Sequence, residues 1–306
     1  MVRVGVVISD VYNLNYKKIT KLAAACLANH IDEFKQDNNG QFDVILRDKI
    51  QSSHHLDDIL GTLYNSIREY LISEKLDLLP INIFLGNFNR ELIHWDFLYV
   101  MEGDLIRDND GFQYDTIRNI NDPKEWIEIR KPDELAAIEN FKKDHNLHKV
   151  SALGGTFDHL HDGHKILLTV AAFLTSERLI IGLTVEELLV SKKYKDIVQD
   201  FDTRRENVVS FLNTFKPSLK IEIIPLKDVC GPTGTVPEIE CLVVSRETVK
   251  GGQIVNKTRK ERGMSQLDLY VVNVLGGKEE DGWKEKMSST DIRKLISSRE
   301  GTSTQI

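Results

Sequence analysis

The chain has 306 residues, a length typical of about two domains. Its 47 acidic residues outnumber its 40 basic ones, and the net charge of −7 argues against non-specific binding to the phosphate backbone of nucleic acids. The 3 cysteines form no C-x-x-C pair, and no apolar run approaches roughly 18 residues. We therefore expect an enzyme of the cytoplasm, with neither a disulfide framework nor a membrane span.

The first half of the chain alternates strand-like and helix-like segments. Apolar spacing predicts strands at 2–9, 42–48 and 81–87. Between them it predicts helices at 16–34 and 55–75. The segments around 97–119 are typical of two antiparallel strands joined by the turn signal DNDG. Residues 1–145 are thus expected to form a small α/β domain, and no motif in them indicates a role.

A charged stretch with Pro123 and Pro132 separates the halves, and we place the domain boundary near residue 146. Beyond it the chain repeats strand and then helix. Strands are predicted at 150–156, 178–185, 220–226, 241–245 and 269–275. Helices are predicted from 163, over 203–215 and from about 288. This alternation predicts a doubly wound, Rossmann-like parallel sheet over 146–306, with ligands bound at the carboxyl ends of its strands.

The stretch GGTFDHLHDGH, residues 154–164, joins the first of these strands to its helix. Gly154 and Gly155 allow a ligand to approach the backbone closely, and Thr156 adds a hydroxyl. His161 and His164 stand at the predicted start of a helix, where N–H groups and the helix dipole favour phosphate. Two imidazoles there can stabilise charge that develops during group transfer.

A second polar cluster, MSSTDIRK at 287–294, opens the last predicted helix. Ser288, Ser289 and Thr290 can cap that helix and present hydroxyls to an anion. Arg293 lies one turn further on, with a guanidinium suited to phosphate. We expect both clusters to belong to one site, because each follows the end of a strand.

The pattern H-x-G-H after G-T-F-D resembles the nucleotidyltransferase superfamily. The segments LGGTFDHLHDGHKILL, VVSRETVKGG, VNKTRKERGMSQL and MSSTDIRK are similar, in their order, to landmarks of the eukaryotic and archaeal phosphopantetheine adenylyltransferase family. The similarity covers about 148–297 and leaves out 1–145. It implies transfer of the adenylyl group of ATP to 4′-phosphopantetheine, with Mg²⁺ arriving on ATP and no dedicated metal ligands.

The resemblance also implies a role for individual residues. Those implied for catalysis are His164, Lys192 and Thr156, with Lys193 and Lys195 as alternatives to Lys192. Those implied for ATP are Gly154, Gly155, Phe157, His161, Arg246, Asn256, Arg259, Arg262, Ser288, Ser289, Thr290 and Arg293. Those implied for phosphopantetheine are Thr156, Lys192, Asp228 and Val229. An exposed basic helix is the plain alternative for Asn256, Arg259 and Arg262.

Two other functions stay open at this point. One is a different H-x-G-H nucleotidyltransferase with another acceptor. The other is a scaffold or sensor subunit that binds coenzyme A without turnover. Neither nucleic acid nor a membrane is expected as a partner, whereas residues 1–145 could dock other enzymes of coenzyme A biosynthesis. No G-x-x-x-x-G-K-[ST] motif indicates a second, kinase activity.

Overall fold

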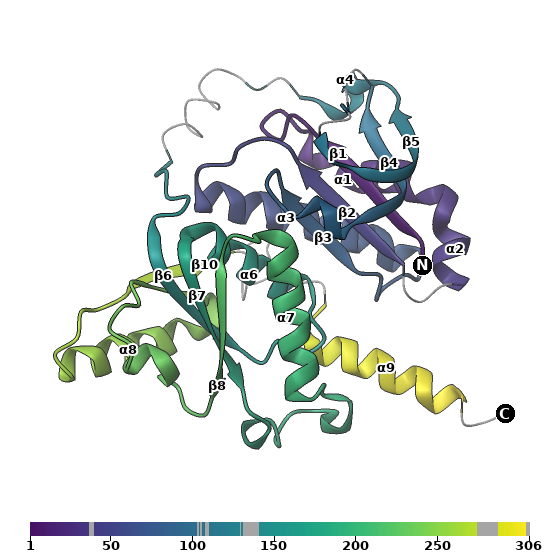
Figure 1. The fold of residues 1–306 in the computed structure, drawn as a ribbon. Helices are drawn as coiled ribbons and strands as arrows, with labels where there is room; N and C mark the ends of the chain where they lie inside the picture. Colours follow the sequence, from purple (N-terminus) through teal and green to yellow (C-terminus); the bar gives the residue numbers. More distant parts are fainter. Residues whose placement is uncertain are drawn as a thin grey trace. The chain divides into compact units, whose positions relative to one another are not determined.

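A computed structural model describes residues 1–36, 40–102, 104, 106, 107, 110–128, 130, 141–273 and 287–303. The chain divides into two compact units (Figure 1). The first consists of Met1–Lys143 with Thr214–Pro217, and the second of Asp144–Asn213 with Ser218–Ile306. Each unit has its own five-stranded sheet. Among the helices that the structure describes, none has the length and apolar character needed to cross a membrane.

The first unit is an α/β layer structure with strand order β3-β2-β1-β4-β5. Its elements are β1 (Arg3–Ile8), α1 (Ile19–Leu27), α2 (Ile31–Gln36), β2 (Gln41–Leu46), α3 (Ser53–Ser73), β3 (Ile81–Leu85), β4 (His94–Met101), β5 (Gln113–Ile120) and α4 (Pro123–Trp126). The helix predicted over 16–34 is divided by a 3₁₀ turn at Ala28–His30. α3 buries its predicted stripe, from Leu56 to Leu71, so its apolar face packs into the core along most of the helix.

The strands β4 and β5 run parallel, with His94 opposite Gln113 and Met101 opposite Ile120. The expected antiparallel hairpin is therefore wrong. Asp110, inside the DNDG signal, is bound by two arginines, one directly after β2 and one in the 3₁₀ turn Arg90–Leu92. Arg47 Nη2 lies 3.2 Å from its carboxylate, and Arg90 Nη1 donates to its carbonyl. Asp110 thus has partners distant in the sequence, which a local turn signal does not include.

The second unit has the order β10-β9-β6-β7-β8, with every neighbouring pair parallel. Its elements are β6 (His148–Gly155), α6 (Asp162–Leu174), β7 (Thr175–Thr184), α7 (Phe201–Phe215), β8 (Lys220–Leu226), β9 (Cys241–Ser245), α8 (Val249–Glu261), β10 (Asp268–Val272) and α9 (Ser289–Ser303). The predicted doubly wound parallel sheet is confirmed.

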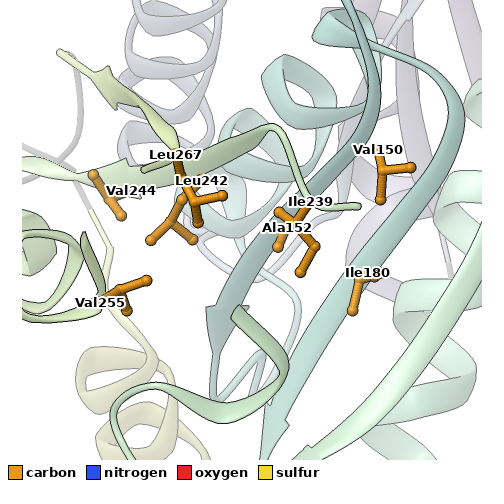
Figure 2. Packing of buried hydrophobic residues seen from close by; sticks show 8 residues of the cluster. All are labelled: Val150, Ala152, Ile180, Ile239, Leu242, Val244, Val255 and Leu267. Atoms are coloured by element: carbon orange, nitrogen blue, oxygen red, sulfur yellow. The ribbon is translucent and has the colours of Figure 1, made fainter. Parts of the chain in front are cut away.

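One face of this second sheet packs under α8. Figure 2 shows the cluster, in which alternate residues of the strands meet a valine of the helix. Its buried members are Val150, Ala152, Ile180, Ile239, Leu242, Val244, Val255 and Leu267. α6 contacts β6, β7 and β9 but supplies no residue to this cluster, so it covers the opposite face. With both faces covered, ligands can reach the sheet only at its edges.

The centre of the second sheet opens toward its carboxyl edge. β6 pairs with β7 as far as Gly155 opposite Leu183. On its other side, β6 pairs with β9 only at Ser151 and Ala152. Strand order reverses at this junction, because the chain passes from β6 to β7 and β8 on one side and to β9 and β10 on the other. Ligands of open α/β sheets bind at such a point.

Candidate active site

The loop after β6 has a conformation that its sequence explains residue by residue. Gly155 lies against the buried ring of Phe157, and a Cβ on this glycine would come within 3.0 Å of the ring. Phe157 and His159 have φ angles of 51° and 45°, in the left-handed region that side chains disfavour. Such backbone strain is typical of functional loops and must be held by surrounding contacts.

Arg204, from the first turn of α7, supplies three of those contacts. Its Nη1 donates to the carbonyl oxygens of Thr156 and Thr184, both at 2.9 Å. Its Nε donates to the carbonyl of Gln199 at 2.9 Å. The side chain is fully buried, so these carbonyls have a charged partner out of water. Sequence reasoning missed Arg204, and its place in an ordinary helical pattern offers no signal for this role.

His161 and His164 form a stacked pair at the start of α6. His161 is the N-cap residue and has extended backbone, with φ −97° and ψ 176°. The ring centroids of the two histidines lie 3.7 Å apart, and the Phe157 ring lies 5.2 Å from that of His164. The spacing of three residues places both imidazoles on one side of the helix start.

The environment of His164 keeps its imidazole neutral. Burial, the His161 ring and the Lys192 ammonium hold the pKa of His164 well below its ordinary value. The buried Nδ1 atom of His164 has no hydrogen-bond partner among the residues that the structure describes. Buried polar atoms usually have a partner, so this nitrogen is a candidate contact for a ligand group. Lys192 is exposed, and its charge lies within electrostatic range of the His164 imidazole.

The second motif joins the first at the N-terminus of α9. The Ser288 hydroxyl donates to the Asp291 carboxylate at 2.6 Å, and the Ser288 backbone N–H donates to it at 3.0 Å. These two hydrogen bonds lower the pKa of Asp291. Ser289 Oγ lies 3.0 Å from His161 Nε2 and 3.2 Å from the carbonyl oxygen of Asp158. The structure thus brings together two motifs that lie far apart in the sequence.

Arg293 takes a different place from the one expected. Its guanidinium forms an ion pair with the buried carboxylate of Asp158 and is itself only 2% exposed. Its Nε donates to the carbonyl of Lys193 at 3.0 Å, and its Nη2 donates to Thr290 Oγ1 at 3.2 Å. In this structure the fork predicted for phosphate binds a carboxylate. Asp158, the last letter of G-T-F-D, was not predicted as a site residue.

The residues predicted on α8 have backbone partners in this structure. Arg259 is fully buried, and its guanidinium donates to carbonyl oxygens that include those of Thr233 at 2.7 Å and Ser265 at 2.6 Å. Asn256 donates to and accepts from the backbone of Leu267. Arg262 Nη1 donates to the carbonyl of Gly234 at 2.6 Å. These three side chains therefore bind backbone around α8 in this structure, and a role toward the phosphates of ATP stays a prediction.

The remaining predicted residues lie at the same carboxyl edge. Arg246 is exposed at the start of a 3₁₀ turn directly after β9. Asp228 follows β8, and its carboxylate accepts the backbone N–H groups of Cys230 and Gly231 at 2.9 and 2.8 Å. This fixes the loop on which Val229 is 62% exposed. An apolar side chain held in solvent beside polar loops is suited to a ligand that is partly apolar.

Comparison with known proteins agrees with this arrangement. Residues 152–295 match the family described as cytidylyltransferase-like. A phosphopantetheine adenylyltransferase of Pyrococcus furiosus is 37% identical over 128 residues, which are 42% of this chain and 79% of its own. An uncharacterized protein of Schizosaccharomyces pombe is 36% identical over 230 residues, or 70% of this chain and 68% of its own.

A longer match decides the family. A phosphopantetheine adenylyltransferase of Saccharomyces cerevisiae is 45% identical over 271 residues, covering 87% of this chain and 86% of its own. A match of this extent reaches beyond the second unit, which has fewer residues. The chain belongs to the phosphopantetheine adenylyltransferase family.

Proposed function

We propose that this chain transfers the adenylyl group of ATP to 4′-phosphopantetheine and releases dephospho-coenzyme A and pyrophosphate. The observation that best supports the reaction is the neutral His164, with a buried Nδ1 atom that lacks a partner among the described residues, at the point where the second sheet opens. A neutral imidazole can donate one hydrogen bond to phosphate without adding a buried charge.

The chemistry requires little from the protein beyond positioning and charge stabilisation. An oxygen of the acceptor phosphate attacks the α-phosphorus of ATP, and the bond from that phosphorus to the bridging oxygen breaks, so that pyrophosphate leaves with the electron pair. The acceptor phosphate is already ionised near neutral pH, so no general base is needed. Catalysis can follow from alignment of the two phosphates and from donors aimed at the developing charge.

A separate set of residues is proposed to bind each substrate. His164 is proposed to contact the α-phosphate, and Lys192 and Thr156 the acceptor phosphate. The backbone of Gly154, Gly155 and Phe157 is proposed to line the ATP site, together with His161, Arg246 and the backbone N–H groups at the start of α9. The ring of Phe157 is buried, so only its backbone is available to the nucleotide. Asp228 and Val229 are proposed to meet the pantetheine arm.

A divalent cation is expected with ATP, and we propose Mg²⁺. The described part of the chain contains no group of three or more His, Cys, Asp or Glu side chains arranged to hold a metal. Asp158, the buried carboxylate of the loop, accepts from Arg293 and from the backbone N–H of Gln199. The residues present therefore do not fit a dedicated metal site, and ATP phosphates and water would supply the ligands.

We also propose that the protein works in the cytoplasm, because its three cysteines are free, as in a reducing compartment. A docking role for residues 1–145 toward other enzymes of coenzyme A biosynthesis remains a proposal. It can be checked by co-purification of those enzymes with the full chain and with a fragment that starts at residue 146.

The first test is pyrophosphate release by the full-length protein with ATP, Mg²⁺ and 4′-phosphopantetheine. Release should require both substrates, and His164→Ala should lower kcat by about a hundredfold or more, the effect of losing a donor to the transition state. His94→Ala is the matched control, because His94 is exposed in the first unit and pairs with Asp115. No release by folded wild-type protein, followed by turnover with another nucleotide or acceptor, would contradict the proposal.

A further inference from the structure

A single serine hydroxyl connects the two motifs of the second unit. Ser289 Oγ lies 3.2 Å from the carbonyl oxygen of Asp158 and 3.0 Å from Nε2 of His161. A carbonyl oxygen can only accept a hydrogen bond, so the hydroxyl proton of Ser289 points to Asp158. A hydroxyl has one proton, which leaves its lone pairs for the histidine.

This count determines which ring nitrogen of His161 is the donor. With its proton committed to Asp158, Ser289 can only accept from His161, so Nε2 of His161 must have a hydrogen. In a neutral imidazole the other nitrogen, Nδ1, is then an acceptor. The contact also fixes the plane of the His161 ring, which stacks on His164 at a centroid separation of 3.7 Å and an angle of 32°.

Ser289 is held in place by a buried ion pair. Arg293, one turn further along α9, binds the carboxylate of Asp158, whose carbonyl accepts from Ser289. Both charged side chains are almost completely excluded from solvent, at 2% and 0% exposure. The other carboxylate oxygen of Asp158 accepts the backbone N–H of Gln199 at 2.9 Å. The start of α9 is thus fixed to the loop after β6 by the contacts of Ser289 and of Arg293.

We propose that Ser289, seated by the Asp158–Arg293 pair, is a positioning residue that sets the donor nitrogen and the ring orientation of His161. Ser289 then acts on the reaction through His161, and Arg293 acts through Asp158, without either side chain having to touch a phosphate. For its effect on turnover the inference rests on the proposed adenylyl transfer, whereas the protonation of His161 can be observed without substrates.

The test compares three serine variants of the full-length protein. Ser289→Ala removes the acceptor, Ser289→Thr keeps a hydroxyl, and Ser298→Ala is the matched control, because Ser298 lies on exposed α9 surface and donates to the Lys294 carbonyl. Long-range ¹H–¹⁵N spectra of histidine-labelled protein at about pH 8, where an ordinary histidine is neutral, distinguish the protonated from the bare ring nitrogen.

Wild type, Ser289→Thr and Ser298→Ala should show His161 protonated at Nε2, and Ser289→Ala should show a mixture of tautomers. In Ser289→Ala, kcat should fall about tenfold or more while the KM for ATP changes less than about threefold, as expected for lost alignment. Ser289→Thr should recover kcat to within about threefold. Asp158→Asn, which weakens the hold of Arg293, should shift the His161 tautomer in the same direction as Ser289→Ala.

Two results would overturn the proposal. One is a His161 tautomer that Ser289→Ala leaves unchanged. The other is a raised KM for ATP with unchanged kcat, which would make Ser289 a direct ligand of ATP in the ground state. If the wild-type protein turned over no substrate, the adenylyl transfer would fail as a function, and the spectra would still decide whether Ser289 sets the tautomer.

Discussion

The two units have the same strand order, yet they differ at the edge where ligands of such sheets bind. Numbered within each unit, both sheets run 3-2-1-4-5, and both reverse direction beside their first strand. In the second unit that strand ends in Gly154 and Gly155, followed by the stacked histidines. In the first unit β1 ends at Ile8 and continues as Ser9-Asp10-Val11, without a glycine.

The corresponding edge of the first unit carries several carboxylates, with Arg47 among them, and is hydrogen-bonded to its own chain. Burial and the nearby Asp10 and Asp104 raise the pKa of Asp48, which shows that carboxylates gather there. Asn13 and Asn15 bind the backbone that follows β5, since Glu128 N–H donates to the Asn13 carbonyl and Asn15 N–H donates to the Trp126 carbonyl. Negative charge repels phosphate, so shared topology does not imply a shared ligand.

The largest expected loss of stability and turnover is at Arg204, and Arg68, a second buried arginine, serves as the comparison. Arg204→Ala should cost about 3–5 kcal/mol of stability, because the Thr156, Thr184 and Gln199 carbonyls lose their donor. It should also reduce kcat sharply under conditions where the variant is folded. Arg68→Ala in the first unit, where Nη1 donates to the Asp77 and Leu79 carbonyls, should destabilise without lowering the kcat of folded protein. Urea unfolding measures the stability of both variants, and steady-state kinetics measures their kcat. An equal kcat in the two variants would contradict the special role of Arg204 in the site.

A smaller contrast is expected between glycines in the two first strands. In Gly5→Ala the new Cβ would lie 2.7 Å from the Trp95 ring, and in Gly155→Ala it would lie 3.0 Å from the Phe157 ring. Overpacking should cost about 1–3 kcal/mol in either variant, as measured by thermal unfolding. Only Gly155→Ala should also lower turnover by about tenfold or more, because it displaces the loop beside His164. A fully active Gly155→Ala would show that the loop tolerates displacement.

The third effect is an acid sensitivity that belongs to the first unit. Burial, Arg130 and His54 lower the pKa of His55 to about 4. The unfolded chain takes up a proton at about pH 6.5, whereas the folded chain does so only near the lowered pKa, so stability falls as the pH drops between these values. In His55→Gln the free energy of unfolding should fall less over this pH range, by on the order of 1–2 kcal/mol. Turnover near pH 7 should not change. Urea midpoints at several pH values test this, and an unchanged pH dependence would exclude His55 as the cause.

The smallest change is expected when the first unit is removed. A fragment of residues 146–306 should fold and keep kcat within about threefold of the full chain, because the contacts that hold the loop after β6 come from Asp158, Arg204 and α9. Circular dichroism and pyrophosphate release would test the fragment. A folded but inactive fragment would give the first unit a part in catalysis.

Local patterns predicted most of the fold, because strands and helices follow from the spacing of apolar residues within each segment. The exceptions depend on distant partners. The strands β4 and β5 pair in parallel, and Asp110, between them in the chain, has distant partners in Arg47 and Arg90. Periodicity gave no warning of the 3₁₀ turn at Ala28–His30 that divides the first predicted helix.

The candidate site shows the same division. The two polar motifs could be found from the sequence because each combines residue types that a plain helix start does not require. The folded-state partners of Arg259 and Arg293 could not, because the same side chain suits phosphate, carbonyl or carboxylate groups. Arg259 meets carbonyls and Arg293 meets Asp158 only after folding. Arg204 was overlooked because its partners lie in three separate segments.

The buried Phe157 ring, with its left-handed backbone, limits how the loop after β6 could be transplanted by protein engineering. A graft of residues 154–164 onto the end of β1 would copy the glycines and histidines but would leave the ring without a cavity and the Thr156 carbonyl without Arg204. A functional graft would have to include the start of α7 and of α9 as well. The smallest portable unit is therefore a set of three separate segments, and the motif alone is not sufficient.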